Sequence, residues 1–471
     1  MQKYQRFVFD SYSLDQKSGE IALKYSLDDT VHFTEHLKLP PATKQVDPSV
    51  LDRALFALHM IGGVSYYKTC VPKTIEIRSG SLTKDQAHFF HEVYEKGLGE
   101  FFFRNDIDFR GLIQFPSNAE KIVPTNQKLK TKNSRRVLVP IGGGKDSIVT
   151  AELLKKAGYD VTLLRMTGHP IIDEMVEALS LPCLTIERKL DPQLFELNKQ
   201  GALNGHVPIT AYLTFAAHIV AMLQDFDAVV LSNERSANIG NVSFKGMVIN
   251  HQWSKSMEFE TMMQGYIQGT IGSSIAVFSL LRPWSELKIV EEFAGHPEYL
   301  EIATSCNKNW KITSLPPLPA GEGARGEREK MRMGKSENGP RNLWCCTCPK
   351  CAFVFALYAA FISREKLEAV FGRNLYDDQS LLPLYRELLG LERYKPFECV
   401  GTPEETAAAF LLARERGQYL SSPAMIMFEK EKLPSIKNPE LLIREALEAS
   451  KEHAIPMEYL QNFPEVLSPK S

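Results

Sequence analysis

Apolar and polar residues alternate along the middle of this chain in a pattern that predicts strands and helices in turn. Short apolar runs typical of buried strands stand at 137–140, 161–166, 183–186 and 227–231. Residues 147–157 carry an apolar stripe at helical spacing, and 209–223 is almost wholly apolar, as expected of a buried helix. Strands that alternate with helices form a parallel sheet covered on both faces. We therefore predict an α/β fold for residues 126–305.

The two flanking regions show different patterns. Residues 1–125 combine strand-like runs with later helical patterns, which predicts a separate N-terminal α+β domain. Residues 352–471 are predicted to be helical: 352–362 is apolar all round, and 404–414 and 439–451 are amphipathic. A chain of 471 residues is long enough for two or three domains, each with a core of its own.

A glycine-rich turn follows the first central strand and leads into its helix. Its residues are Gly142, Gly143, Gly144, Lys145, Asp146 and Ser147. Glycines let backbone N–H groups approach an anion, and the N-terminus of the following helix adds a partial positive charge. Lys145 can screen charge, Asp146 can hold a magnesium ion, and Ser147 can donate a hydrogen bond to a phosphate. The turn is therefore predicted to bind a nucleotide.

This turn differs from the commoner phosphate-binding loop, in which Gly, four spacers, Gly-Lys and then Ser or Thr follow one another. Here Asp146 follows Lys145, and Val139 stands at the position of the first glycine. Residues 142–147 instead resemble the PP-loop, Ser-Gly-Gly-x-Asp-Ser, of the ATP pyrophosphatase superfamily, with Gly142 at the serine position. Members of that superfamily adenylate a substrate and release pyrophosphate. The resemblance implies a PP-loop core that binds ATP with Mg²⁺.

Further polar residues follow the predicted strands, at the sheet edge where open α/β folds bind their ligands. Arg165 comes at the end of one strand and is predicted to contact the nucleotide. The segments 232–238 and 250–260 are rich in carboxylates, bases and amides. We expect them to be loops that recognise a large, polar, charged ligand.

Four of the eight cysteines are spaced as metal ligands. Cys345, Cys348 and Cys351 form a C-x2-C-x2-C run, and a tetrahedral zinc ion needs a fourth thiolate. Cys306 is the best candidate for that ligand, and Cys346 is its rival. Four thiolates leave no open position for water, so zinc at this site is expected to be structural.

The residues between these cysteines have a different composition. Residues 315–340 are rich in Pro, Gly and charged side chains and carry few apolar ones. Such a segment has too little apolar surface to offset the entropy lost on ordering. We therefore predict that 306–351 forms a cysteine knuckle interrupted by a disordered insertion at 315–340.

Composition and charge narrow the setting in which the protein works. The chain has a formal net charge of −2 at pH 7, which argues against bulk binding of nucleic acid. It has no apolar run long enough to span a bilayer, and its first residues lead into no signal-peptide hydrophobic region. We predict a cytoplasmic enzyme that binds neither nucleic acid nor membrane.

Several segments together resemble the MurL family, the UDP-N-acetyl-α-D-muramoyl-L-alanyl-L-glutamate epimerases. They are residues 139–147, 204–208, 232–238, 250–256 and 348–351. The similarity spans nearly the whole chain apart from 315–340. It implies an enzyme of peptidoglycan precursor synthesis that converts the terminal L-glutamate of a UDP-muramoyl dipeptide to D-glutamate. ATP is consumed to AMP and pyrophosphate in that reaction.

The implied use of ATP has a chemical reason. An α-proton beside a free carboxylate is very weakly acidic, because its removal places a second negative charge next to the first. Adenylation of the carboxylate removes that charge, so the carbanion becomes a stabilised enolate and the barrier falls. Hydrolysis of the acyl-adenylate then releases the product.

Epimerisation also needs an acid and a base at the α-carbon. The candidates are His206, Glu234, His251 and Lys255, and His251 is favoured because histidine exchanges protons near neutral pH. Two other functions remain open: a PP-loop synthetase that joins a carboxylate to ammonia in nucleobase modification, and a nucleotide-binding regulatory protein without turnover. Ammonia dependence distinguishes the first, and ATP binding without pyrophosphate release distinguishes the second.

Overall fold

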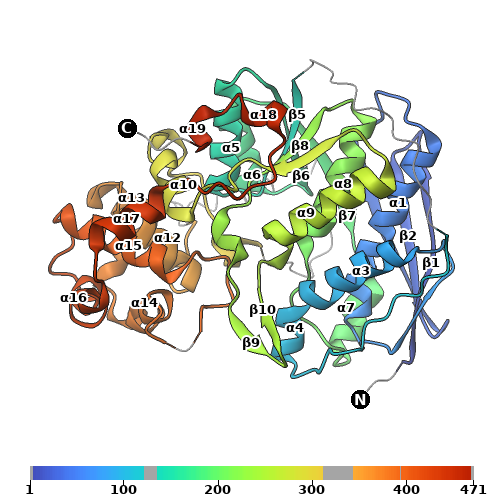
Figure 1. Cartoon of the computed structure of the whole chain (residues 1–471), viewed down its shortest axis with the longest axis horizontal. Coiled ribbons are helices and arrows are strands. Elements are labelled where there is room, and N and C mark those ends of the chain that lie inside the picture. The colour runs from blue at the N-terminus through green and yellow to red at the C-terminus, as the bar shows by residue number, and fades with distance from the viewer. Residues whose placement is uncertain (1–3, 121–134, 311–342, 393, 468–471) are drawn as a thin grey trace, which may run out of the picture.

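A nine-stranded mixed sheet forms the centre of the protein (Figure 1). The computed structural model describes residues 4–120, 135–310, 343–392 and 394–467. The strands lie in the order β11-β8-β5-β6-β7-β3-β2-β1-β4. Their bounds are Arg6–Asp15 (β1), Glu20–Leu27 (β2), Val31–Lys38 (β3), Thr74–Ile77 (β4), Arg136–Pro140 (β5), Asp160–Met166 (β6), Cys183–Lys189 (β7), Ala228–Leu231 (β8) and Ala276–Ser279 (β11). The strands from β11 to β7 are parallel, which confirms the predicted α/β core.

The N-terminal strands continue this sheet. β3 pairs antiparallel with β7, with His36 opposite Lys189, and β3, β2 and β1 form an antiparallel meander. The sequence predicts a separate domain before residue 125, whereas the structure joins its strands and its apolar side chains to those of the central region. Pairing with β3 satisfies the backbone donors and acceptors that β7 would expose as an edge strand.

Successive residues of the parallel strands face two different cores. Val137 and Val139 of β5 pack in one core with α5 (Lys145–Lys156). Leu138 packs in the other with α8 (Ile209–Leu223), whose bounds are those predicted from its apolar run. This period of two buries both faces of the sheet.

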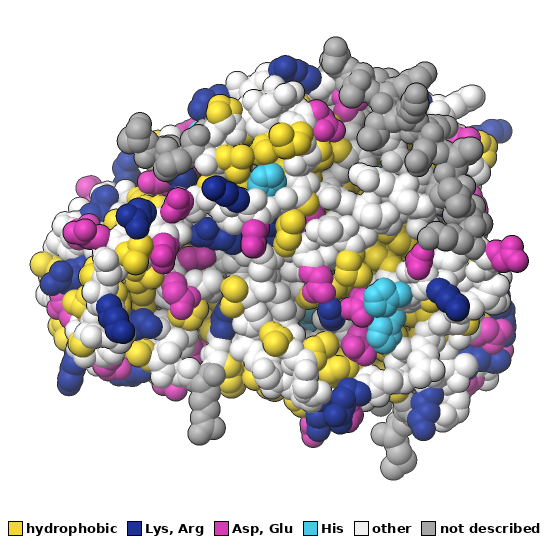
Figure 2. Space-filling view, in the orientation of Figure 1, with side chains coloured by type: hydrophobic (Ala, Val, Ile, Leu, Met, Phe, Trp, Pro, Cys, Tyr) yellow, Lys and Arg dark blue, Asp and Glu magenta, His cyan; other side chains and the backbone are white. Residues whose placement is uncertain are grey.

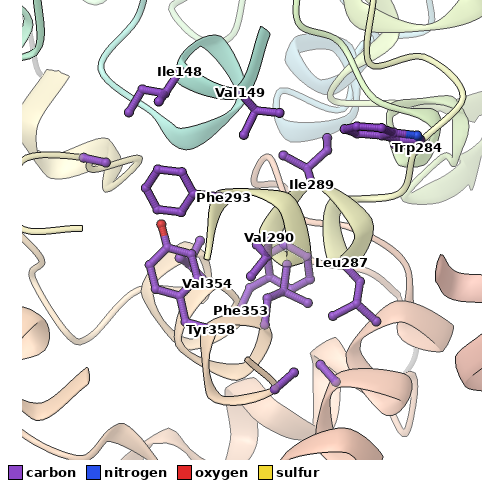
Figure 3. Packing of buried hydrophobic residues seen from close by; sticks show 14 of the residues in the cluster. Ile148, Val149, Trp284, Leu287, Ile289, Val290, Phe293, Phe353, Val354 and Tyr358 are labelled. Carbon is purple, nitrogen blue, oxygen red and sulfur yellow. The ribbon is translucent and has the colours of Figure 1, made fainter. Parts of the chain in front are cut away.

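Helices cover each face. α1 (Pro48–Gly62), α3 (Lys84–Gly97) and α9 (Met257–Tyr266) contribute to the same core as α8. On the other face, the apolar residues of α10 (Glu286–Phe293) lie between those of α5 and α12 (Pro349–Ala359), as Figure 3 shows. The first residue of α10 is thereby held close to the starts of α5 and α12.

A layer of helices packs beyond α10 and confirms the predicted helical C-terminal region (Figure 1, orange to red). Its elements after α12 include α13 (Arg364–Phe371), α14 (Leu382–Leu388), α15 (Pro403–Glu415), α16 (Pro423–Glu431) and α17 (Pro439–Leu447). The predicted insertion at 315–340 lies outside the described residues.

One segment predicted as a loop contains a helix. The Ser256 hydroxyl accepts a hydrogen bond from the Phe259 backbone N–H at 3.2 Å and caps the start of α9. Glu258 and Glu260 lie in the first turn, where negative charge favours a helix. The polar residues of 256–260 are thus the start of a helix rather than the end of a loop.

The surface carries charges of both signs. Lys and Arg side chains mix with Asp and Glu across the face in Figure 2, in keeping with the small net charge. Within the described residues, no helix combines the length and apolar character needed to cross a bilayer.

Candidate active site

The glycine-rich turn lies between the carboxyl end of β5 and the start of α5. Gly143 has a φ of +86°, which favours glycine, and a Cβ there would stand 2.8 Å from the Trp310 ring. A Cβ at Gly142 would meet nothing within 4 Å. The Ser147 hydroxyl donates to the Gly144 carbonyl at 3.1 Å and closes the first turn of the helix. The predicted strand, turn and helix are therefore all present in the structure.

Lys145 lies in a buried ion-pair network rather than facing solvent. Its Nζ is 2.5 Å from Asp146 Oδ1 and also contacts Glu286 Oε2. Burial disfavours the charged amine, but the two carboxylates outweigh burial and raise the pKa of Lys145. Lys145 is therefore a fixed cation that neutralises these carboxylates, while the Asp146 side chain keeps 30% of its surface exposed.

Glu286 connects the turn to α12. Its Oε1 is 3.2 Å from Lys350 Nζ, and Lys350 also donates to the Cys399 carbonyl. Burial would raise the pKa of Glu286, but Lys145 and Lys350 lower it below the usual value. A chain of contacts therefore runs from Asp146 through the two lysines to Cys399.

A second polar cluster, formed by Glu100, His206, His251, Lys255 and Cys399, lies at the end of that chain of contacts. His251 Nδ1 contacts Glu100 Oε2, and the rings of His206 and His251 are 4.5 Å apart. Lys255 Nζ donates to Cys399 Sγ at 3.8 Å. The two histidines and Lys255, which are far apart from Glu100 and Cys399 in sequence, are thus brought together.

The elements around this cluster fix its members. Glu100 lies on α4 (Gly99–Arg104) and also accepts from Arg104 Nε at 2.5 Å. His206 precedes α8, and the His251 backbone N–H donates to Asn241 Oδ1 at 2.8 Å. The donor atoms of Glu100, His206 and His251 lie within 4.8 Å of one another. Glu100 already accepts hydrogen bonds from His251 and Arg104, so these side chains satisfy one another within the cluster.

Protonation differs sharply among these groups. Burial and neighbouring His251 lower the pKa of His206 to about 4. Burial also opposes protonation of His251, but hydrogen bonds to Cys399 and Glu100 raise its pKa to about 9. Burial would raise the pKa of the Cys399 thiol, but Lys255 and His251 lower it to about 7. A cationic histidine and a cationic lysine therefore accompany a thiol that ionises near neutral pH.

Glu234 is buried and is influenced by charges from both parts of the site. Burial raises the pKa of its carboxyl group, Glu286 raises it further, and Lys255 opposes the shift. Lys255 in turn interacts with Cys399, Glu234 and Asp146. The four residues predicted for proton transfer therefore share one electrostatic environment with the glycine-rich turn.

Arg165 has partners of its own. It lies at the carboxyl end of β6, the neighbour of β5, where the sequence predicts a nucleotide contact. Its Nε donates to Thr185 Oγ1 at 2.9 Å, and its Nη1 contacts Asp173. The guanidinium is thus engaged within the protein.

The structure brings Cys306 together with Cys345, Cys348 and Cys351. The sulfur of Cys351 lies 3.7 Å from that of Cys345 and 3.5 Å from that of Cys348. The four sulfurs all lie within 4.8 Å of one another. Sulfur atoms about 2.3 Å from a zinc ion stand about 3.8 Å apart in a tetrahedron, so the cluster is compatible with structural zinc.

Cys346 faces away from this cluster. Its thiol donates to the carbonyls of Trp344 at 3.4 Å and Phe371 at 3.2 Å. Of the two cysteines that the sequence leaves open as the fourth member, the structure therefore places Cys306 among the other three.

The cysteine cluster supports the glycine-rich turn from two sides. The Thr304 backbone N–H, two residues before Cys306, donates to the Gly143 carbonyl at 2.9 Å. Lys350, between Cys348 and Cys351, reaches Glu286. Order in the cysteine cluster therefore contributes to order at the turn.

Sequence reasoning missed four residues of the site: Glu100, Glu286, Lys350 and Cys399. Lys350 lies within the cysteine run that the sequence marks, and Glu286 is the first residue of α10, after its cap Ser285. Glu100 and Cys399 stand in no motif, and only long-range packing brings them to His251.

The fold and site define an α/β protein with a glycine-rich turn between β5 and α5 and a buried polar cluster connected to it. The models of the MurL N-terminal domain and the MurL C-terminal domain match residues 1–280 and 330–440. The chain belongs to the MurL family.

Curated relatives match nearly the whole chain. A protein of Xanthomonas oryzae pv. oryzae is 36% identical over 96% of this chain and 95% of its own length. A protein of Salinispora tropica is 38% identical over 90% of this chain and 88% of its own length. A Micromonospora protein is 37% identical, with 90% of each chain covered. All three are named UDP-N-acetyl-alpha-D-muramoyl-L-alanyl-L-glutamate epimerase.

Proposed function

We propose that this protein epimerises the terminal L-glutamate of UDP-N-acetylmuramoyl-L-Ala-L-Glu to D-glutamate, with ATP converted to AMP and diphosphate. Its family and the names of its relatives support the substrate. The observation that supports the proposal is the chain of contacts from Asp146 to Cys399, because it connects the glycine-rich turn to the cluster that holds the groups proposed for proton transfer.

The glycine-rich turn serves the first chemical step. Its backbone amides and the N-terminus of α5 are suited to the phosphates of ATP. The partly exposed carboxylate of Asp146 fits a hard cation, and Mg²⁺ bound there would neutralise phosphate charge. The substrate carboxylate attacks the α-phosphorus, and diphosphate leaves. The product of this step is an acyl-adenylate.

The cluster around His251 serves the second step. The α-proton of the acyl-adenylate is acidic enough to be removed, and a proton returns on the opposite face. His251, His206, Glu234 and Lys255 are the predicted groups for this exchange. Water then hydrolyses the acyl-adenylate to AMP and the UDP-muramoyl dipeptide that ends in D-glutamate. The remote nucleotide and sugar supply binding energy that orients the glutamate.

Two ATP analogues test the proposed bond cleavage. A β,γ-imido analogue can still release its two terminal phosphates, so it should support epimerisation, whereas an α,β-methylene analogue should not. Chiral analysis of the glutamate and quantification of AMP check the result, with one AMP expected per inversion. Turnover with the α,β-methylene analogue would contradict adenylation. An amide formed on addition of ammonia would instead indicate a synthetase.

Zinc is proposed as the structural ion of the cysteine cluster, at one per chain. Cys348→Ser and Cys351→Ser should each lose the metal and lower the melting temperature by several degrees or more, because structural zinc contributes directly to folding. Cys346→Ser is the matched control, since its thiol faces away from the cluster. Elemental analysis and thermal unfolding check both. If elemental analysis finds no zinc in the wild-type protein, the four cysteines are reduced thiols rather than metal ligands.

A further inference from the structure

The Cys399 thiol has a set of neighbours that no structural need explains. It lies on the segment between α14 and α15, partly accessible to solvent. Lys255 donates to its sulfur at 3.8 Å, and the His251 side chain is near enough to lower the pKa of the thiol. Lys350 holds the carbonyl of the same residue. Backbone and side chain of Cys399 are thus both fixed by cationic groups.

Glu100 orients His251 toward this thiol. The carboxylate contacts Nδ1 of the ring, and the same ring interacts with the Cys399 thiol. Arg104 holds the other carboxylate oxygen, at 2.5 Å. A carboxylate, an imidazole and a thiol in this order form the arrangement by which proteins activate a sulfur atom. Cys399 is the end of that arrangement, and His251 is its middle member.

The other candidate groups are poorly placed to remove a proton. Lys255 and His251 are held in their protonated forms by the carboxylates and thiol around them. Burial makes His206 a weak base and raises the pKa of Glu234, which favours its protonated form. The thiolate of Cys399 is the remaining base in the cluster, and Glu234 is an available acid.

We propose, on the basis of the function proposed above, that Cys399 is a catalytic residue that removes the α-proton from the activated glutamate. The sulfur gains the proton, and the electron pair of the Cα–H bond moves into the enolate of the acyl-adenylate. Glu234 gives a proton to the opposite face and becomes a carboxylate. Lys255, which interacts with both residues, then passes a proton to Glu234 and takes one from the thiol. His251 and Glu100 are positioning residues.

Cys399→Ser separates the two half-reactions. A serine hydroxyl is a far weaker acid than a thiol and stays un-ionised near neutral pH, so the variant lacks the base. Incorporation of α-deuterium from deuterium oxide should therefore fall by about 100-fold or more. Substrate-dependent exchange of labelled diphosphate into ATP should persist, because the glycine-rich turn is intact. Cys70→Ser is the matched control: its sulfur accepts from the Thr69 hydroxyl at 3.9 Å and is not a member of the cluster, so both half-reactions should remain.

The outcomes are distinct. If Cys399→Ser incorporates deuterium at the wild-type rate, the role proposed for Cys399 is overturned and the proposed function still stands. Loss of diphosphate exchange as well, at an unchanged melting temperature, would also overturn it by assigning Cys399 to substrate binding. A covalent substrate adduct on Cys399 would make the thiol a nucleophile instead. Wild-type protein that shows no ATP-dependent wash-in would refute the proposed function itself.

Discussion

Replacing Asp146 with Asn is expected to lower the rate of diphosphate release by about 10³-fold or more, because it removes the carboxylate proposed to hold Mg²⁺ at the phosphates. Folding should survive the change. Lys145 keeps its contact with Glu286, and the Asp146 side chain is partly exposed. Stopped assays with labelled ATP and thermal unfolding measure the two effects.

Two further variants sharpen this prediction. Ser147→Ala should act in the same direction, because it removes a hydroxyl at the turn. Asp85→Asn, which changes an acidic residue in the first turn of α3, is the control for loss of charge at a helix start. Near wild-type diphosphate release in both Asp146→Asn and Ser147→Ala would refute nucleotide binding at the turn.

Glu286→Gln is expected to cause the largest loss of stability, about 3–5 kcal/mol in the free energy of unfolding. The carboxylate is buried and faces Lys145 and Lys350. Its removal leaves Lys350 as a buried cation without its partner carboxylate. Urea unfolding measures the loss, and Glu286→Gln combined with Lys350→Met should recover part of it. A loss below about 1 kcal/mol, as at exposed ion pairs, would contradict this account.

The stability difference between wild type and Glu286→Gln should depend on pH. Burial opposes ionisation of Glu286, but the two lysines lower its pKa in the folded protein. A carboxyl group whose folded pKa is lowered stabilises the fold above its unfolded pKa, and that stabilisation is lost as the pH falls. The difference between wild type and Glu286→Gln should therefore shrink below about pH 4.3. A difference that grows in acid would contradict the ion-pair network.

Local patterns predicted the elements around the site well. The apolar run at 209–223 has the bounds of α8, because a helix buried on all sides needs no polar face. The glycines before Lys145 marked the turn because Gly143 adopts a left-handed conformation. The C-x2-C-x2-C spacing located three of the four clustered sulfurs, because these three cysteines are close together in the sequence.

Long-range contacts lay beyond these patterns. The pairing of β3 with β7 joins residues about 150 positions apart, so the shared sheet left no local signal. Cys399 meets Lys255 across a similar separation, and Glu100 meets His251 in the same way. Isolated residues such as Cys399 and Glu100 can be recognised as part of the site only once the fold shows which charged groups surround them.

We propose that the glutamate α-carbon is deprotonated only after ATP activates its carboxylate. Incubation of the UDP-muramoyl dipeptide in deuterium oxide, with and without ATP and Mg²⁺, tests it by mass spectrometry and chiral analysis of the glutamate. We expect D-glutamate carrying one deuterium at the α-carbon when ATP is present, and unlabelled L-glutamate when it is absent. Equal conversion without ATP would contradict the account.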